Sequence, residues 1–424
     1  MQTLMITLKI ITPLFLGGVD PNQRAELRPP SLKGALRVWY RAIDPDYNKQ
    51  ISKDGPTWEA SIFGGTKANE GQGAFLMSID RVREGTLKWD RDRYQRLTQG
   101  SGTSSKNGVI YLAYPLDTGG RSSERKQRAY ISPGQALTVT LRFKKDPDPK
   151  IRRAVAAAWW LLGHVGGVGA RSRRGFGTLA LQKWPTSGSS WSEFSELPIA
   201  HGNITTEKWL ECFEQGLKVL KSWYPQFKQT DIDHTVIGPE ACFYLFKKGY
   251  GTDNGMQPWE NALNAAGLTM QSFRQRYGLT SGDYQNVKGH LGKRYPKAPC
   301  DVPRQDLTKA PDRAAFGLPL AFQYSSMRYE STDQDGKART RTPNIAFQGM
   351  EHDRSASPLF IRIVEIGGLC YAFFALLNAS LLESGEKIKE QHDGKYSWTP
   401  PDRQILHDFC NKKLKPASLK EVRP

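Results

Sequence analysis

The sequence predicts an α+β fold built from two similar domains in tandem, and three observations lead to this prediction. The chain has 424 residues, which is longer than one ordinary domain. Its first 185 residues show strand and helix patterns in the order strand, helix, strand, strand, helix, strand. The second half shares a feature of the first, a glycine turn with nearby arginines that leads into hydrophobic strands. We therefore expect domains at residues 1–185 and 186–424, with a linker near 184–200.

In the first domain, period-two alternation of apolar residues predicts the strands, and apolar residues three to four apart predict the helices. Ser31 and Asp148 are the expected N-caps of the two helices. The element order is that of a ferredoxin-like (RRM-like) split βαβ unit. The expected strands are residues 2–11, 73–80, 135–144 and 178–182, and the expected helices are residues 32–43 and 151–164.

The remaining segments are read in the same way. Residues 84–130 are polar and basic and are expected to be a long insertion, with a short strand at 109–114 and a mobile tract at 119–128. Residues 331–343 are expected to be a disordered loop. The expected elements of the second half are helices at 206–224 and within 259–277, and strands at 241–247, 321–324, 357–365 and 369–377.

Composition argues against several classes of protein. No apolar run is long enough to cross a membrane, and the N-terminus has no basic region before an apolar core, so we expect neither a membrane protein nor an export signal. The five cysteines are dispersed without a CxxC pair, which argues against a disulfide framework and a structural zinc. We expect a cytoplasmic protein with no metal and no cofactor. Trp39, Trp159 and Trp160 lie at helical spacings that favour the core over stacking platforms.

Charge is the first functional signal. The chain has 60 Lys and Arg against 42 Asp and Glu, a net charge of +18. Residues 1–185 carry +15 and residues 186–424 only +3. This asymmetry indicates that one half faces a polyanion, and nucleic acid is the commonest such partner.

A basic stripe lies on the first predicted helix. Lys33, Arg37 and Arg41 follow one another at intervals of four residues, beside the apolar face of that helix. Such a stripe is often only a solvated surface. Its position on a helix whose N-terminus favours anions makes it a candidate for contact with an anionic partner.

The most informative stretch is GGVGARSRRGFG, residues 166–177. Its glycines allow positive φ angles and a close approach of the backbone to a ligand. Its arginine forks suit phosphates, and its aromatic ring is available to stack on a base. The spacing excludes a Walker loop, and the helix-to-strand context excludes a dinucleotide fingerprint; a flexible basic hairpin is the alternative interpretation. The candidate residues are Gly166, Gly167, Gly169, Arg171, Arg173, Arg174, Gly175, Phe176 and Gly177.

This loop resembles the glycine-rich loop of the RAMP superfamily of CRISPR-associated proteins. The N-terminal blocks TPLFLGG, LRPPSLKGALRVWYRA and SIFGG resemble the subunit 1 family of the Cmr complex, the type III-B effector, and FGLPLAFQYSS and HDRSASPLFIRIVE extend the resemblance into the second half. The resemblance implies two RAMP domains and no nuclease activity. It also implies binding of the 3′ region of the guide RNA and of the target RNA, together with other Cmr subunits. It assigns RNA contact to the stripe, to the loop and to Arg354.

Two alternatives remain open. Related RAMP proteins cleave CRISPR transcripts without a metal, and such cleavage needs a positioned acid or base. His164 adjoins the loop, where a cation would also favour the helix dipole, and His352 lies close to Arg354. The second alternative is a protein scaffold, which predicts that the chain alone does not bind RNA.

Overall fold

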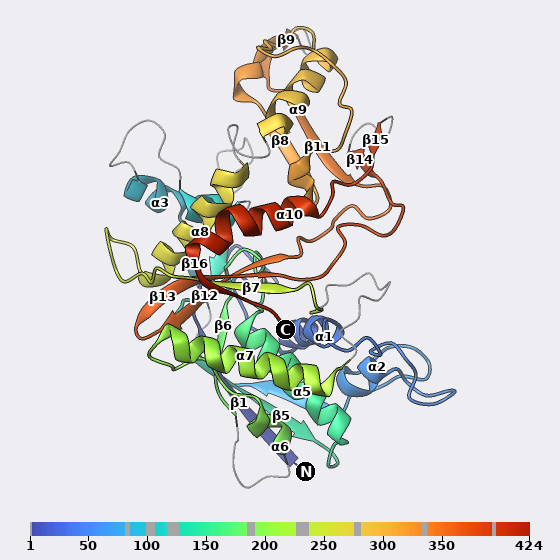
Figure 1. The fold of residues 1–424 in the computed structure, drawn as a ribbon. Coiled ribbons are helices and arrows are strands. Elements are labelled where there is room, and N and C mark those ends of the chain that lie inside the picture. Colours follow the sequence, from blue (N-terminus) through green and yellow to red (C-terminus); the bar gives the residue numbers. More distant parts are fainter. Residues whose placement is uncertain are drawn as a thin grey trace. The chain divides into compact units, whose positions relative to one another are not determined.

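The structure is a computed structural model that describes residues 2–80, 85–98, 107–114, 116, 127–184, 191–225, 237–274, 281–332, 337–391 and 396–424. The chain forms two compact units (Figure 1). Unit 1 contains Met1–Leu268, Phe360–Asn378 and Ala417–Pro424, and unit 2 contains Thr269–Leu359 and Ala379–Pro416. The predicted domain division at residue 185 stays a prediction, because it refers to repeats of one fold and not to compact units.

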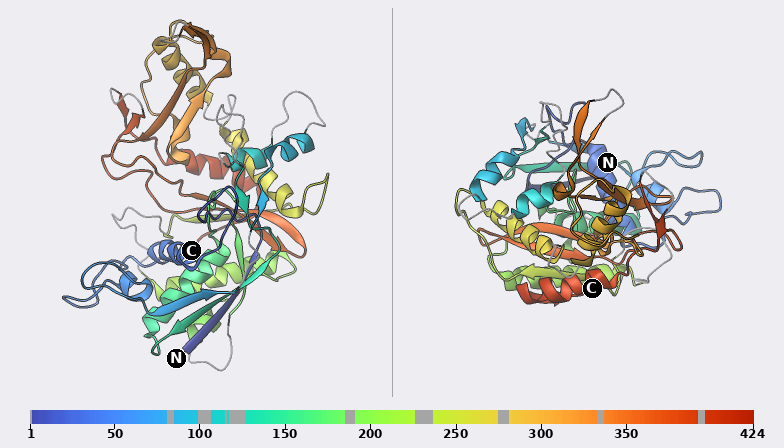
Figure 2. Two further views of the ribbon diagram at one scale, coloured as in Figure 1. Left: turned by 180° about the vertical axis from the view of Figure 1, so that it is seen from behind. Right: turned by 90° about the horizontal axis from the view of Figure 1, so that it is seen from above.

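The first sheet of unit 1 confirms the element order predicted for residues 1–185. Its strands are β1 (Gln2–Ile10), β2 (Phe75–Ile79), β5 (Ala136–Phe143) and β6 (Leu179–Lys183). They pair antiparallel in the order β2-β5-β1-β6. Alternate residues of β1 are buried as the period-two pattern predicts. Helices α1 (Pro29–Arg41) and α5 (Pro149–His164) pack on one face of this sheet (Figure 2). Met5 of β1 and Leu76 of β2 are exposed.

Two helices begin at prolines in this part of the chain. In α5 (Pro149–His164) the side chain of Asp148 accepts a hydrogen bond from the amide of Lys150, as predicted for an N-cap. Helix α1 (Pro29–Arg41) begins earlier than predicted, with Arg28 at the N-cap position. Ser31 therefore lies inside the first turn and the prediction that it is the N-cap is wrong, because the prolines at the first two positions already suit a helix start.

The second sheet of unit 1 repeats the strand order of the first. It contains β7 (Cys242–Phe246), β12 (Leu359–Ile366), β13 (Leu369–Leu376) and β16 (Ser418–Val422), in the order β12-β13-β7-β16. In both sheets the first and third strands of the chain are central and the second and fourth are at the edges. Helix α8 (Pro258–Arg274) follows β7, as α1 follows β1.

Helix α7 (Thr206–Trp223) joins the two sheets into one core. The ring of Phe213 on α7 stacks on Trp160 of α5, with ring centroids 5.5 Å apart. The same ring makes edge contacts with Phe243 of β7 at 5.2 Å and with Phe373 of β13 at 5.4 Å. Trp159 and Trp160 are fully buried, which confirms their prediction as core residues.

The remaining elements of unit 1 are short. They are α2 (Trp58–Phe63), β3 (Leu87–Lys88), α3 (Arg91–Thr98), α4 (Gly108–Ala113), β4 (Ala129–Tyr130) and α6 (Ser192–Glu196). The strand predicted at 109–114 is wrong, since α4 occupies it and Asn107 caps that helix through a hydrogen bond from the amide of Ile110. The predicted linker is also wrong over 191–200, where Trp191 and Phe194 are buried. Residues 119–126 of the predicted mobile tract lie outside the described residues.

Unit 2 has its own sheet and core. Its four-stranded sheet has the order β15-β14-β11-β8, and a core that includes Val287, Leu291 and Phe347 packs on it. The disordered loop predicted at 331–343 is wrong over its described part, where β9 and β10 form an antiparallel ribbon. The elements are α9 (Ser281–Arg294), β8 (Leu320–Gln323), β9 (Tyr329–Thr332), β10 (Ala338–Arg341), β11 (Asn344–Gly349), β14 (Ile388–Glu390), β15 (Ser397–Trp398), α10 (Gln404–Phe409), α11 (Lys415–Ala417), and short helical turns at Asp312–Phe316, Ser325–Met327 and Cys410–Leu414.

A buried arginine of β12 holds the end of α5. The guanidinium of Arg362 donates hydrogen bonds to the carbonyls of Leu162 (3.1 Å), Gly166 (2.5 Å), Leu179 (2.6 Å) and Gly163. A helix leaves its last carbonyls without helical partners, and a cation there also opposes the negative end of the helix dipole. Burial lowers the pKa of Arg362 to about 9, so the group stays protonated at neutral pH.

Replacing Arg362 should therefore destabilise unit 1. In Arg362→Met the carbonyls lose their donors while they remain buried, and we expect the free energy of unfolding to fall by roughly 3 kcal/mol or more. Urea unfolding followed by tryptophan fluorescence measures this change, because Trp159 and Trp160 lie in the same core. The matched control is Arg354→Met at an exposed position, where we expect a change within about 0.5 kcal/mol. Equal effects of the two variants would contradict the structural role of Arg362.

Candidate nucleic-acid interface

The glycine-rich loop, residues 166–177, connects α5 to β6 in unit 1. Gly169, Gly175 and Gly177 have φ angles of 88°, 88° and 64°, which confirms the prediction that the loop uses positive φ. At Gly169 a Cβ atom would also collide with the backbone of Phe15. The glycines therefore let the loop fold tightly against its own domain, and the alternative of a flexible hairpin does not describe this geometry.

The three loop arginines are half-buried. Arg171 has a φ of 65°, unusual for a residue with a side chain, and its Nε donates a hydrogen bond to the carbonyl of Leu112 at 2.9 Å. The guanidinium of Arg173 lies 4.6 Å from the ring centroid of Phe360. Burial lowers the pKa of Arg173 to about 10, so the group remains a cation at neutral pH. The loop thus presents cations whose side chains are already held by the protein.

The loop backbone is attached to the second sheet. The amide of Ile361 in β12 donates a hydrogen bond to the carbonyl of Arg173 at 3.1 Å, and Arg174 forms a parallel bridge with Ile361. Next to this bridge, Arg362 binds the carbonyl of Gly166 at the start of the loop. The start of the loop and its arginine segment are therefore both held by β12.

Phe176 does not have the predicted stacking role. Its ring is fully buried and makes edge contacts with Phe15 at 5.6 Å and with Trp89 at 5.4 Å. The prediction that this ring is available to stack on a base is therefore wrong for this conformation. Phe176 instead packs the loop onto the core beneath it.

The basic stripe of α1 has an acidic partner within the protein. Arg41 donates to both carboxylate oxygens of Glu59, one at 2.6 Å, and Arg37 donates to the same carboxylate at 2.8 Å. Burial by itself would raise the pKa of Glu59, but the hydrogen bonds and charges of the two arginines outweigh it and lower that pKa. Glu59 is therefore ionised and fixes both guanidinium groups.

Lys33 is the third cation of the stripe, and with it the stripe has more positive than negative charges. Its ammonium lies 5.5 Å from the ring centroid of Phe75, and burial, with the charge of Arg37, lowers its pKa. Three cations against one carboxylate leave a formal charge of +2 on the cluster. The structure also joins α1 to the loop region, because the ring of Trp39 lies 5.4 Å from that of Phe360, the ring on which Arg173 packs.

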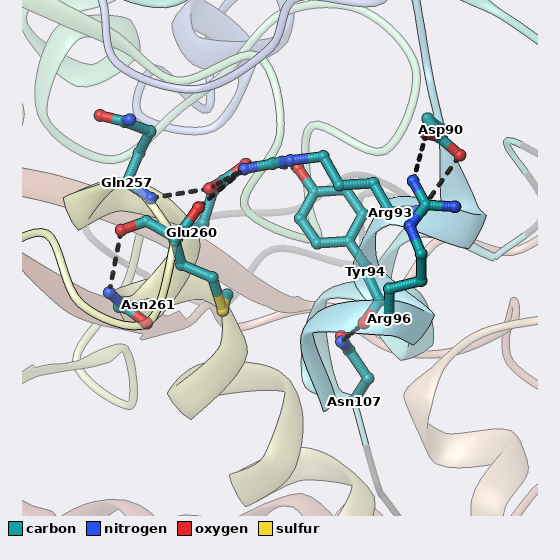
Figure 3. A network of polar contacts seen from close by, with 10 residues as sticks. Asp90, Arg93, Tyr94, Arg96, Asn107, Gln257, Glu260 and Asn261 are labelled. Carbon is teal, nitrogen blue, oxygen red and sulfur yellow. Dashed lines mark hydrogen bonds and ion pairs between the residues drawn. The ribbon is translucent and has the colours of Figure 1, made fainter. Parts of the chain in front are cut away.

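The insertion packs on α8 through a buried carboxylate (Figure 3). Glu260 on α8 is buried and accepts hydrogen bonds from the hydroxyl of Tyr94 at 2.6 Å and from Arg93 at 2.9 Å. Asn107 bridges the helices by donating to the carbonyl of Tyr94 at 2.9 Å. These contacts hold α3 and α4 in place. Leu112 belongs to α4, so these contacts also position the Leu112 carbonyl that accepts the hydrogen bond from Arg171.

The candidates of unit 2 are at the surface. Arg354 is exposed, in agreement with a contact role, although its RNA contact stays a prediction. His352 is engaged with two carboxylates: Nδ1 lies 2.9 Å from Glu386 and Nε2 lies 3.3 Å from Glu383. The hydrogen bond with Glu386 raises the pKa of His352.

His164 is poorly placed for acid–base chemistry. It is buried, its Nε2 accepts a hydrogen bond from the amide of Ala200 at 3.0 Å, and its Nδ1 therefore donates to the carbonyl of Trp160 at 2.8 Å. Burial lowers its pKa to about 3, so the ring is neutral at physiological pH. The interpretation of His164 as a cation at the helix end is thus wrong, and Arg362 supplies that charge instead.

The described part of the chain shows neither a candidate metal site nor a membrane-spanning helix. There, His, Cys, Asp and Glu form no group of three or more that could hold a metal ion. Among the described helices none is long and apolar enough to span a membrane.

Reasoning from the sequence missed the residues that position the loop and the stripe. Arg362 is a single charge inside the apolar strand LFIRIVEI, and a charged residue in such a strand is expected to be buried with dedicated acceptors. The sequence alone therefore indicated that Arg362 is buried among hydrogen-bond acceptors. Glu59 and Phe360 had no comparable signal, because their roles depend on side chains distant in the sequence.

Comparison with known proteins supports the predicted resemblance. Residues 7–180 match the model of the RAMP superfamily. CRISPR system Cmr subunit Cmr1-2 of Pyrococcus furiosus is 26% identical over 194 residues, which cover 43% of this chain and 96% of that protein. Cmr subunit Cmr1-1 of the same organism is 26% identical over 171 residues, 40% of this chain and 45% of that protein.

A solved structure extends the likeness to the rest of the chain. The crystal structure of Cmr1 from Pyrococcus furiosus in its apo form matches with a TM-score of 0.54 and 17% identity, and the match covers 98% of this chain and 97% of that one. At this identity the likeness shows a shared fold, a mixed fold of helices and sheets of the RAMP type. The predicted resemblance to the RAMP superfamily and to the Cmr subunit 1 family is confirmed.

The low pKa of His164 predicts a dependence of stability on pH. The folded pKa of about 3 lies below the ordinary value of 6.5, so the unfolded chain takes up the proton first as pH falls. The contribution of His164 to stability is complete above pH 6.5 and is lost toward pH 3, by at most about 1.4 kcal/mol per pH unit. Urea unfolding of the wild type and of His164→Asn between pH 4 and pH 8 should show their difference in free energy shrinking below pH 6.5. Parallel curves would contradict a neutral, buried His164.

Proposed function

We propose that this chain, whose residues 7–180 belong to the RAMP superfamily, is a non-catalytic RNA-binding subunit of a Cmr-type, type III-B CRISPR effector ribonucleoprotein. In this role it holds the 3′ region of the guide RNA and its target RNA, together with other Cmr subunits. The observation that carries the proposal is the match of 43% and 40% of this chain to two proteins named as Cmr subunits.

The fold supports two copies of the RAMP domain. We infer that each sheet of unit 1 belongs to one ferredoxin-like domain, because both sheets have the same order of first, second, third and fourth strands. On this reading, most of unit 2 is inserted between α8 and β12, and the rest between β13 and β16. The second domain would therefore be interrupted in sequence and complete in space.

The site geometry supports RNA binding through phosphates. Arg173 keeps its charge at neutral pH, and the α1 cluster has a formal charge of +2. Guanidinium groups bind phosphates through paired hydrogen bonds, and contacts of this kind carry no information about base sequence. A subunit that reads the backbone alone suits a complex in which guide pairing reads the sequence.

The alternative is a metal-independent endoribonuclease of the RAMP type. Its best candidate base, His164, is buried, and both of its ring nitrogens are engaged. Its second candidate, His352, is bound to two glutamates. The geometry therefore favours binding over cleavage.

A gel experiment on the purified chain distinguishes the two functions. We expect labelled single-stranded RNA to shift on native gels at low salt, to be released as salt rises, and to stay intact on denaturing gels with or without Mg²⁺. Cleavage that His164→Ala abolishes would overturn the proposal in favour of the nuclease. Absence of any shift at low salt would favour a protein scaffold.

The loop arginines should contribute to binding for all RNA sequences alike. In the triple variant Arg171→Ala, Arg173→Ala and Arg174→Ala we expect weaker binding, and a fall of about 2 in the slope of log K against log salt if each cation contacts one phosphate. Fluorescence anisotropy with several RNA sequences measures both changes. The matched control replaces three exposed lysines of α7, Lys208, Lys218 and Lys221, by Ala, with the same change in charge.

Because Arg173 packs on Phe360, loss of folding must be separated from loss of contact. A variant with lysine at the three loop positions keeps the charge, and its salt slope should stay close to that of the wild type. A thermal melting curve of each variant reports whether unit 1 is folded. An unchanged salt slope in a folded alanine variant would show that these arginines do not contact phosphates.

A further inference from the structure

The ribbon of β9 and β10 in unit 2 is a surface that the proposed function does not use. The two strands pair antiparallel, with Arg339 opposite Ser331 and Arg341 opposite Tyr329. All four residues of β10 are exposed. Figure 1 shows β9 next to α9, and the rings of Tyr295 and Tyr329 lie 6.4 Å apart at this junction. The ribbon is thus attached to unit 2 at one end and open to solvent along β10.

Strand geometry sorts the charges of this ribbon onto one face. Side chains alternate along a strand, so Arg339, Arg341 and the preceding Lys337 point the same way, about 6.8 Å from one to the next. Directly opposed residues of an antiparallel pair share a face, which adds Ser331 and Tyr329. The acidic residue of the described strands, Glu330, is opposite Thr340 and lies on the other face. One face therefore presents a row of three cations.

The charge of unit 2 as a whole agrees with an anionic partner. Unit 1 contains 39 Lys and Arg against 27 Asp and Glu, and unit 2 contains 21 against 15. Unit 2 thus carries +6 on fewer than half as many residues as unit 1, which carries +12. The near neutrality of residues 186–424 conceals this, because acidic residues between 186 and 268 belong to unit 1.

We propose that this cationic face of the β9–β10 ribbon binds the phosphate backbone of single-stranded RNA, as a second contact in addition to the loop and α1. The regular spacing of the cations is comparable to that of successive phosphates in an extended strand. Arginine forks bind phosphates through paired hydrogen bonds, and Arg339 and Arg341 are both exposed. The inference rests on the proposed RNA-binding function, since it assigns further residues to that activity.

The test compares two triple variants of the full chain that have the same net charge. The ribbon variant carries Lys337→Gln, Arg339→Gln and Arg341→Gln. The control carries glutamine at Lys297, Lys387 and Lys412, which are exposed in unit 2 but do not form a row. Binding of a labelled single-stranded RNA is measured by anisotropy over a salt series. We expect the ribbon variant to lose roughly tenfold in affinity and about 2 in salt slope, and the control to change little.

A change in the opposite direction strengthens the test. The sequence between the two strands contains Asp333 and Asp335, which lie outside the described residues. Replacing both by Asn removes two negative charges that are close in sequence to Lys337, Arg339 and Arg341. Because less negative charge then repels the phosphates, RNA binding should tighten. The ribbon itself should stay folded in this variant, because the cross-strand partners are unchanged.

The outcomes separate the two proposals. If the wild type binds RNA with a strong salt dependence and the ribbon variant binds equally well, the ribbon inference is overturned and the proposed function stands. Equal losses in the ribbon variant and in the control would also overturn it, because net charge alone would then explain the effect. If the wild type does not bind RNA at any salt concentration, the proposed function and the ribbon contact are both overturned.

Discussion

The buried guanidinium of Arg362 is the interaction on which the geometry of the candidate interface depends. It binds four carbonyls at one point, where α5 ends, the glycine-rich loop begins and β6 passes. Its partners are neutral carbonyl groups, so the charge is stabilised by dipoles and not by a counter-ion. Burying a charge in this way is costly unless its donors find acceptors, and the two terminal nitrogens of Arg362 make four such bonds while its buried Nε makes none to the described residues. The loop can therefore take its observed conformation only when β12, almost two hundred residues further along the chain, is in place.

Some charged residues of unit 1 form ion pairs inside the protein, and the sequence alone does not distinguish these residues from the candidates for ligand contact. Arg37 and Arg41 neutralise Glu59 on α2, and Arg93 neutralises Glu260 on α8. These pairs hold α1 and the insertion in place. Counted by compact unit instead of by sequence half, the charge excess is spread over both units. The strong asymmetry at residue 185 therefore reflects in part how the chain is threaded through the two units.

Patterns that depend on neighbouring residues were predictable, and those that depend on distant partners were not. The alternation in β1 and β5 and the cap at Asp148 are local, and the structure confirms them. The segment at 109–114 is short and apolar, and such a run is ambiguous between strand and helix. Asn107 and the packing on α8 decided it. The polar composition of residues 331–343 suggested disorder, whereas cross-strand pairing ordered the described part of that segment as a ribbon.

The candidate site shows the same division in its chemistry. Glycine content predicted the positive φ angles of the loop, because that preference belongs to the residue itself. The burial of the Phe176 ring depends on residues that are distant in the sequence, because Phe15 and Trp89 pack against it beneath the loop. The loop arginines are consequently half-buried and partly ordered before any ligand binds, so they lose little side-chain entropy on binding. The cations of β10 are more exposed than the loop arginines, so a larger part of their side-chain freedom would be lost on binding. Under the proposed function, the loop would fix where the RNA backbone lies, and the ribbon would add attraction at a greater entropic cost.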